Sequence, residues 1–355
     1  MKAKRVEKIL VTGGAGFIGS HVAEFYARKG VYVTVFDNIS RAQLLGKGYK
    51  NALYNWNYIT KHENIKLVKG DVTIFEQIKQ VCKDADLIIH TAAQTAVTTS
   101  LIEPKNDFLI NALGTFNVLE AARKSGNTPA IIYLSTNKCY GDNVNEISVK
   151  QNGKRYHFAD EKYRNGIPEH FPMDLCGHSP YGCSKLAGDL YAQDYAHTYG
   201  LKTGIFRMSC IYGPRQFGVE DQGWVAWFAI ATITGKSITI YGDGKQVRDV
   251  LYINDLINAF DAFLQRKNQL SGEVFNMGGG PENTISLLEL LDLLKQLTGK
   301  RSKVNFSNWR PSDQKVYISN ISKAKEKLGW NPKVCPKEGV EKLVNWVSEN
   351  KNLFK

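Results

Sequence analysis

Several features that mark other protein classes are absent from this sequence. Its 355 residues include no apolar run approaching the roughly 20 residues of a membrane-spanning helix, and no repeat or low-complexity tract. The six cysteines include no Cys-x-x-Cys pair, which argues against a disulfide framework. Cys176, His178 and Cys183 lie close together, but their spacing fits no structural zinc pattern, so we expect no metal. The N-terminal residues lead directly into the first predicted strand and leave no room for a signal peptide, which predicts a cytoplasmic protein.

The composition is strongly basic, yet no segment concentrates the charge. The formal net charge is +12. A nucleic-acid-binding protein typically gathers its basic residues in one stripe or tail, whereas these lysines are dispersed along the whole chain. We therefore predict a solvated, lysine-rich surface that also attracts an anionic small-molecule substrate, with no nucleic acid and no membrane as partner. A steep salt dependence of retention on DNA would instead favour nucleic-acid binding.

A glycine-rich turn follows the first predicted strand, residues 9–11, and opens a helix. Gly14, Gly16 and Gly19 fit the G-x-G-x-x-G spacing of a dinucleotide-binding turn, and Gly13 precedes them. Glycine is expected there because a side chain would hold the backbone away from a pyrophosphate. The helix N-terminus then offers unpaired N–H groups and the positive end of its dipole to the phosphates.

An acidic residue completes this pattern. Val31 to Phe36 form the second predicted strand, and Asp37 follows it at the expected distance from the glycines. A carboxylate at this position accepts hydrogen bonds from the adenosine ribose hydroxyls and repels a 2′-phosphate. The sequence therefore predicts NAD as the cofactor in preference to NADP.

Predicted strands and helices alternate through the first 212 residues. Buried strands follow at 65–68, 86–90, 130–134 and 203–208, with helices such as 74–82 and 108–124 between them. The alternation predicts an α/β fold, a Rossmann-type doubly wound parallel sheet with helices on both faces. His90, at the end of one of these strands, is expected to be a packed structural histidine.

The alternation stops near residue 213, which predicts a second and smaller part of the molecule. We predict a Rossmann domain over 1–212 and a mixed α/β C-terminal substrate lobe over 213–355, of which about 246–280 return to the first domain. Residues 142–177 are polar and irregular, and such a long connection predicts a lid or rim over the site.

Tyr181 and Lys185 are four residues apart in a predicted helix and therefore share one face. A tyrosine with a pKa near 10 is a poor base at neutral pH, but a lysine ammonium beside it favours the phenolate. Such a tyrosinate can take a proton from a sugar hydroxyl while a nicotinamide takes a hydride from the same carbon. Ser135 and Thr136 add hydroxyls at the carboxyl end of a strand, where ligands bind in such sheets.

Together these residues resemble the extended short-chain dehydrogenase/reductase family, which contains the NAD-dependent sugar-nucleotide epimerases and dehydratases. The resemblance covers nearly the whole chain. Its motifs are TGGAGFIG at 12–19, Asp37-Asn38, Gly70-Asp71-Val72, Ala92-Ala93, Asn111-x-x-Gly114-Thr115, Ser135-Thr136, Tyr181 with Lys185, Tyr212-Gly213-Pro214-Arg215, 244–250 and Arg310-Pro311-x-Asp313.

The resemblance implies a role for each matching residue. Thr136 hydrogen-bonds the reacting hydroxyl, Tyr181 is the acid/base, and Lys185 tunes it. Arg248 and Arg310 match positions that hold the nucleotide diphosphate, a task that suits the bidentate donors of a guanidinium. The implied NAD-binding residues are Gly13, Gly16, Phe17, Ile18, Gly19, Asp37, Asn38, Ser40, Arg41, Asp71, Val72, Ala92, Ala93, Asn111, Ser135, Tyr181, Lys185 and Met208. The implied substrate-binding residues are Thr136, Asn137, Cys210, Arg215, Gln216, Trp224, Gln246, Arg248, Arg310 and Asp313.

Asn137 and Lys138 stand where the dehydratases of this family carry Asp-Glu. Eliminating water from a keto-sugar needs a general acid and a general base at adjacent carbons, so dehydration is disfavoured. The stretches 135–142, 178–185, 215–225 (with its Asp-Gln-Gly-Trp) and 244–251 resemble instead the CDP-sugar 2-epimerases, the branch that acts on CDP-paratose and CDP-tyvelose. Many relatives carry Asn, whose amide holds substrate phosphate, where this chain has Cys210. The resemblance implies transient oxidation at C2, turning of the sugar, and return of the hydride to the opposite face.

Two other hypotheses remain open at this point. One is an NAD-dependent epimerase that acts at C4 of a UDP-sugar, and the other is a dinucleotide-sensing protein without catalysis. Intact Thr136, Tyr181 and Lys185 argue against the second. Relatives pair through two helices, so the resemblance also implies a homodimer or homotetramer.

Overall fold

The computed structural model describes residues 6–41 and 53–354. Its contacts divide the chain into two units, which comprise 1–135, 183–206 and 257–274 in the first and 136–182, 207–256 and 275–355 in the second. The predicted boundary at 212 assigns residues 136–182 to the first domain. In the structure they join the second unit, because their backbone bonds to later segments, as from Tyr156 N to Lys245 O (3.0 Å) and from Ile167 N to Ile318 O (2.7 Å).

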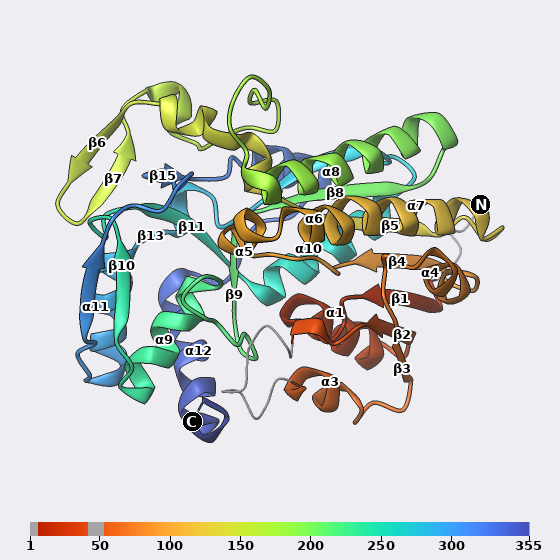
Figure 1. The fold of residues 1–355 in the computed structure, drawn as a ribbon, viewed down its shortest axis with the longest axis horizontal. Helices are drawn as coiled ribbons and strands as arrows, with labels where there is room; N and C mark the ends of the chain where they lie inside the picture. Colours follow the sequence, from red (N-terminus) through yellow and green to blue (C-terminus); the bar gives the residue numbers. More distant parts are fainter. Residues whose placement is uncertain (1–5, 42–52, 355) are drawn as a thin grey trace. The chain divides into compact units, whose positions relative to one another are not determined.

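The first unit is organised around a seven-stranded sheet with the order β12-β8-β5-β4-β1-β2-β3. Figure 1 shows β5, β4, β1, β2 and β3 side by side in that order. The strands are β1 Lys8–Thr12, β2 Tyr32–Asp37, β3 Ile65–Lys69, β4 Leu87–His90, β5 Ala130–Thr136, β8 Thr203–Met208 and β12 Glu273–Met277. The pairs β1–β2, β1–β4, β2–β3 and β4–β5 are parallel. The predicted Rossmann-type α/β fold is confirmed.

The core of this unit consists of the apolar residues that the strands and helices turn toward each other. Leu10, Ile88 and Ile131 come from β1, β4 and β5, and Ile78 and Val118 come from two helices packed against them. The helices that lie wholly or mainly in this unit are α1 Phe17–Arg28, α3 Tyr54–Ile59, α4 Phe75–Cys82, α5 Val97–Ile102, α6 Pro104–Phe108, α7 Gly114–Lys124, α8 Ser179–Tyr199 and α10 Ile253–Arg266; the first turns of α8 and α10 belong to the second unit. The predicted helix at 108–124 is helical throughout, but its first turn, Leu109–Leu113, is a π-helix that joins α6 to α7. Such wide turns are frequent at functional sites.

The second unit is built on β11 (Val247–Tyr252), every residue of which is buried. It pairs with β13 (Thr284–Ser286) in the antiparallel sense and with β9 (Cys210–Tyr212) and β15 (Val316–Tyr317) in the parallel sense. Further elements of this unit are the strands β10 Ile238–Tyr241 and β14 Val304–Ser307 and the helices α9 Trp224–Thr234, α11 Leu287–Thr298 and α12 Pro336–Glu349. None of the helices in the described residues is long and apolar enough to cross a membrane.

The polar connection at 142–177, predicted to be irregular, contains a β-hairpin. Strands β6 (Val149–Asn152) and β7 (Arg155–Phe158) are antiparallel, and Gly153, with φ +56°, takes the left-handed conformation in the turn between them. The strands are short and have no fully buried residue, so they lack the apolar alternation by which a strand is recognised. The hairpin is held to α11 and its neighbouring loop by ion pairs of Lys154 and Arg155 and by a 2.6 Å hydrogen bond from Tyr156 to Asp243.

Candidate active site

The glycine-rich turn after β1 has little room for any side chain. Gly13, with φ +69°, donates its N–H to the carbonyl of Phe36 at 2.8 Å. A Cβ at Gly13 would lie 2.5 Å from the backbone N of Ala92, and a Cβ at Gly19 would lie 2.4 Å from the carbonyl O of Gly13. Gly16 precedes α1 and provides no side-chain cap, so the first N–H groups of the helix remain available to an anion. The residues present therefore fit a dinucleotide pyrophosphate, and they also show that glycine is needed for packing within the turn.

Asp37 lies at the carboxyl end of β2, as predicted, and its carboxylate organises the neighbouring backbone. It accepts hydrogen bonds from the N–H of Ala15 (2.9 Å) and from the N–H of Ile39 (2.7 Å). Burial raises the pKa of Asp37, while these two hydrogen bonds act in the opposite direction. The side chain thereby fixes the glycine-rich turn relative to the end of β2.

Asp71, after β3, is linked to the same region through Asn38, whose amide donates to it at 2.8 Å. Burial alone would raise the pKa of Asp71, but hydrogen bonds from Asn38 and Thr73 outweigh it and hold the pKa below its ordinary value. The carboxylate therefore stays ionised and fixed in orientation. Of the other predicted NAD residues in this unit, Val72 is buried, and the partly exposed ones are Phe17, Ile18, Ser40, Arg41, Ala92 and Ala93. Met208, which is also partly exposed, belongs to the second unit.

Lys185 lies on α8, one turn after Tyr181, as predicted from the sequence. Its side chain is only 4% exposed, and its ammonium lies 4.4 Å from the centre of the Tyr133 ring. Burial lowers the pKa of Lys185 to about 7, against the opposing attraction of Asp189 and Asp107. A lysine with this pKa can exchange a proton at neutral pH, which suits a group that tunes a neighbouring acid/base.

A buried hydrogen-bond network lies around Ser184, the residue that precedes Lys185 on α8. The side-chain amide of Asn111, in the π-helical turn, accepts a hydrogen bond from the backbone N–H of Gln94 and donates one to the carbonyl of Gln94 (3.0 Å each). It also donates to the hydroxyl of Ser184 (3.1 Å). Asp107 accepts hydrogen bonds from Ser184, from Asn111 (3.2 Å) and from Gln94 (2.9 Å). Asn111 is fully buried, so it positions α8 and the residues after β4.

Sequence patterns did not predict Asp107, Ser184 and Gln94 as members of this network. The one local signal was spacing, because Asp107 lies four residues before Asn111 and Ser184 directly precedes Lys185. Ser135, predicted to bind NAD, is fully buried and donates to Asp189 at 2.6 Å. Its hydroxyl thus anchors α8 to the end of β5.

His90 is a structural residue, as predicted. Its two ring nitrogens are hydrogen-bonded to the hydroxyls of Thr12 (2.7 Å) and Thr115 (3.1 Å). Burial lowers the pKa of His90 to about 3, and the nearby Lys185 acts in the same direction. The ring is therefore neutral and holds β1, β4 and α7 together.

The remaining predicted residues cluster within the second unit. Tyr181, Thr136 and Asn137 are buried, and the Thr136 hydroxyl accepts a hydrogen bond from the backbone N–H of Lys138 at 3.3 Å. Thr136 is the N-cap of the 3-10 segment Asn137–Glu146, so the end of β5 fixes its position.

Both predicted diphosphate arginines are held by carboxylates. Arg248, on β11, pairs with Asp313 at 2.6 Å. Arg310 pairs with Asp221 at 2.8 Å and lies 3.9 Å from the centre of the Tyr241 ring. Asp313 of the Arg-Pro-x-Asp motif thus meets Arg248 of the 244–250 motif, and Arg310 meets the Asp-Gln-Gly-Trp stretch.

The other predicted substrate residues flank these pairs. Cys210 accepts a hydrogen bond from the indole N–H of Trp224 at 3.3 Å, and burial raises the pKa of its thiol. The side-chain amide of Gln216 donates a hydrogen bond to the carbonyl of Ile211 (3.1 Å), and that of Gln246 donates one to the carbonyl of Tyr241 (2.6 Å). Both amides therefore stabilise the local backbone. Arg215 is buried, with φ +61°.

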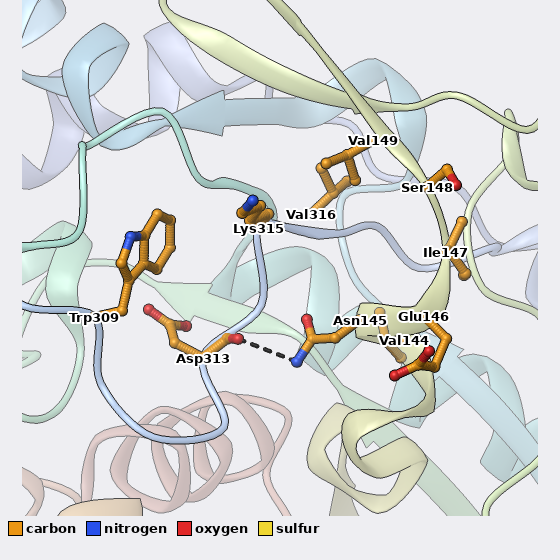
Figure 2. Close-up of a pocket in the computed structure, with 10 residues that line it drawn as sticks. All are labelled: Val144, Asn145, Glu146, Ile147, Ser148, Val149, Trp309, Asp313, Lys315 and Val316. Atoms are coloured by element: carbon orange, nitrogen blue, oxygen red, sulfur yellow. Dashed lines mark hydrogen bonds between the residues drawn. The ribbon is translucent and has the colours of Figure 1, made fainter.

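A cavity of about 550 Å³ lies against this cluster, within the second unit. Figure 2 shows its lining, in which the amide of Asn145 donates to the backbone carbonyl of Asp313 at 3.2 Å. Trp309 and Asp313 belong to one loop, and Glu146 lies across from them (Figure 2). The volume is within the range of small-molecule sites, and Asp313 connects the cavity to Arg248.

Comparison with known proteins finds relatives along almost the whole chain. Residues 10–343 match the family described as GDP-mannose 4,6 dehydratase. The chain is 40% identical to CDP-paratose 2-epimerase of Salmonella typhi, over 96% of this chain and 99% of the relative. It is 32% identical to UDP-glucuronate 4-epimerase of Thermodesulfobacterium geofontis, over 98% of each chain.

Solved structures of epimerases have the same fold. UDP-glucose 4-epimerase of Thermotoga maritima with UDP-glucose superposes with a TM-score of 0.78 at 32% identity, over 97% of this chain and 99% of that one. UDP-glucuronic acid 4-epimerase of Bacillus cereus, in complex with UDP-glucuronic acid and NAD, gives 0.79 at 26% identity, with the same coverage. The chain therefore belongs to the GDP-mannose 4,6 dehydratase family, within the extended short-chain dehydrogenases/reductases that its motifs resemble.

Proposed function

We propose that this protein is an NAD-dependent isomerase that inverts C2 of a CDP-sugar, converting CDP-paratose to CDP-tyvelose or acting on a related CDP-hexose. The observation that carries the proposal is the 40% identity to a CDP-paratose 2-epimerase along almost the whole of both chains. Asn137 and Lys138 agree with it, because neither can act as the acidic pair of a dehydratase at neutral pH.

The chemistry assigned to this chain's residues is a proton transfer at one oxygen. Tyr181 takes the proton of the C2 hydroxyl and later returns it, while Thr136 donates a hydrogen bond that orients the same oxygen. Lys185, in its protonated form, supplies the positive charge that favours the tyrosinate, and its pKa of about 7 lets it exchange a proton near neutral pH. NAD, when bound, supplies reversible hydride transfer at C2.

Inversion also requires that the sugar turns without being released. Arg248 and Arg310 hold the diphosphate in this proposal, and their carboxylate partners keep the guanidinium groups in place. Anchoring the diphosphate leaves the sugar ring able to present its other face. Because the hydride would return to the same sugar, the cycle would consume no NAD, and the cofactor would stay bound.

The second candidate is a 4-epimerase of a UDP-sugar, which is favoured by the similarity to UDP-sugar 4-epimerases. One experiment separates the two. The purified protein is denatured, the released dinucleotide is identified, and CDP- and UDP-sugars are assayed by NMR for inversion at C2 and C4 in D₂O. We expect NAD, inversion at C2 of a CDP-sugar, and no solvent deuterium at that carbon. Inversion at C4 of a UDP-sugar would establish the second candidate, and deuterium at C2 would indicate a deprotonation mechanism.

We also infer a homodimer or homotetramer. Large apolar side chains are exposed on the helices of the first unit, namely Ile102, Phe108, Leu190 and Tyr191. Burying them against a second copy would remove apolar surface from water. Light scattering coupled to size exclusion measures the mass directly. A cytoplasmic location is proposed as well, because all six cysteines lie in the described residues and none of them forms a disulfide.

A further inference from the structure

Lys138 is two residues after Thr136, in the 3-10 segment that Thr136 caps. Its side chain is only partly exposed, and its ammonium donates a hydrogen bond to the carbonyl of Ser312 at 3.1 Å. An ammonium has three N–H donors. Among the described residues this is the one hydrogen bond that its ammonium makes, so two donors remain.

The charges around Lys138 come from four different segments of the second unit. Burial lowers the pKa of Lys138, Arg248 lowers it further, and Asp313, Cys210 and Asp142 act in the opposite direction. Within the described residues, no carboxylate lies within ion-pair distance of this ammonium. Asp313, the first of the opposing groups, is already engaged by Arg248 at 2.6 Å and by the N–H of Gln314 at 2.9 Å.

Lys138 and Arg248 are two neighbouring cations with unused N–H donors, and a bound anion would stabilise both. A phosphate between Lys138 and Arg248 would neutralise their mutual repulsion and accept the remaining N–H groups. A lysine serves this purpose as a compact charge, whereas the guanidinium adds bidentate geometry.

The position of Lys138 relative to Thr136 indicates which of the two phosphates of a nucleotide diphosphate it would bind. The anomeric carbon, which carries the phosphate, is bonded directly to C2, whereas C4 lies on the opposite side of the sugar ring. An enzyme that oxidises C2 must therefore bring the sugar-linked phosphate next to the residue that binds the reacting hydroxyl. The backbone N–H of Lys138 bonds to the Thr136 hydroxyl at 3.3 Å, so the lysine side chain starts beside that residue. Its ammonium extends to the carbonyl of Ser312, in the loop that carries Arg310 and Asp313. A glutamate, as in the dehydratases, would repel the phosphate.

We propose that Lys138 is a substrate-binding residue that holds the sugar-linked phosphate of the nucleotide diphosphate and so directs the reaction to C2. The proposal rests on the proposed function, and it adds a third cation to the two arginines. Lys138 then holds the phosphate nearest the reacting carbon in place while the sugar turns.

The test compares binding of CDP, which carries the sugar-side phosphate, with binding of CMP, which lacks it, by calorimetry on the full-length protein. The same pair of measurements is made with UDP and UMP. The variants are Lys138→Met, Lys138→Gln as a second substitution with a polar end, and Lys150→Met as a control at an exposed lysine of β6. We expect Lys138→Met and Lys138→Gln to weaken CDP binding at least tenfold, about 1.4 kcal/mol, with CMP binding unchanged within about twofold. The control should change neither.

Each outcome has one meaning. Unchanged CDP affinity in both Lys138 variants, or an equal loss for CDP and CMP, would refute the role of Lys138. If the wild type binds UDP more tightly than CDP, cytosine is refuted as the nucleobase of the substrate. The difference in affinity between the diphosphate and the monophosphate of either nucleoside still tests Lys138. Binding of no nucleoside diphosphate by the wild type would overturn both proposals.

Discussion

Replacing the buried Lys185 by methionine should change how the stability of the protein depends on pH. Lys185 has a pKa of about 7 in the folded protein, compared with 10.5 for an ordinary lysine. The gap corresponds to a penalty of about 5 kcal/mol for the protonated folded state, at 1.36 kcal/mol per pKa unit. Methionine has a similar length and no charge to bury, and Asp189 and Asp107 keep their hydrogen bonds to Ser135 and Ser184.

The sign of the effect follows from proton binding. At pH 6 the lysine is protonated in both states, so the folded protein carries the full penalty. As the pH rises through about 7, the folded state loses its proton while the unfolded state keeps it until about 10.5. The unfolded state then binds more protons, so the stability of the wild type rises with pH. Between pH 6 and pH 9 the gain from this one residue is about 2.5 kcal/mol.

The assay is denaturant unfolding of the dinucleotide-free protein at pH 6 and pH 9, followed by circular dichroism. We expect Lys185→Met to be more stable than the wild type at pH 6, with an advantage that shrinks by about 2.5 kcal/mol at pH 9. Lys150→Met, at an exposed position, controls for the loss of one charge. An advantage of Lys185→Met that is equal at both pH values would refute the assignment of a strongly lowered pKa to this lysine.

Three further substitutions test other parts of the site. Tyr181→Phe should retain NAD and lower turnover by about two to four orders of magnitude, and near-normal turnover would exclude Tyr181 as the acid/base. Gly19→Ala should abolish dinucleotide binding and lower the melting temperature, because the new Cβ would lie 2.4 Å from the carbonyl O of Gly13; retention of NAD with an unchanged melting temperature would show that the turn adapts. Asp313→Asn should raise KM for the CDP-sugar about tenfold with a smaller change in kcat, since it removes the charge that orients Arg248 at 2.6 Å; steady-state kinetics measure both, and an effect on kcat alone would contradict this role.

Local sequence patterns predicted much of the fold. The apolar stretches of the sheet have the period and length of buried strands, so β8 was predicted to the residue. The hairpin at 149–158 was missed, because its strands are partly exposed and carry no apolar alternation. The irregular connection was also assigned to the first domain, whereas its backbone hydrogen bonds run to segments about 90 to 150 residues later.

The sequence by itself determined the features that lie within one or two turns of chain, namely the glycine-rich turn, Asp37 after β2, and the Tyr181–Lys185 spacing on α8. Only the tertiary structure decided which side chains meet. The Arg248–Asp313 pair joins residues 65 positions apart, and the hydrogen bond from Lys138 to Ser312 joins residues 174 positions apart. No periodicity encodes such partners, because they depend on how separate elements pack and on which polar groups are left without water when they do. The lowered pKa of Lys185 has the same origin, since burial by Tyr133 and its neighbours exists only in the folded chain.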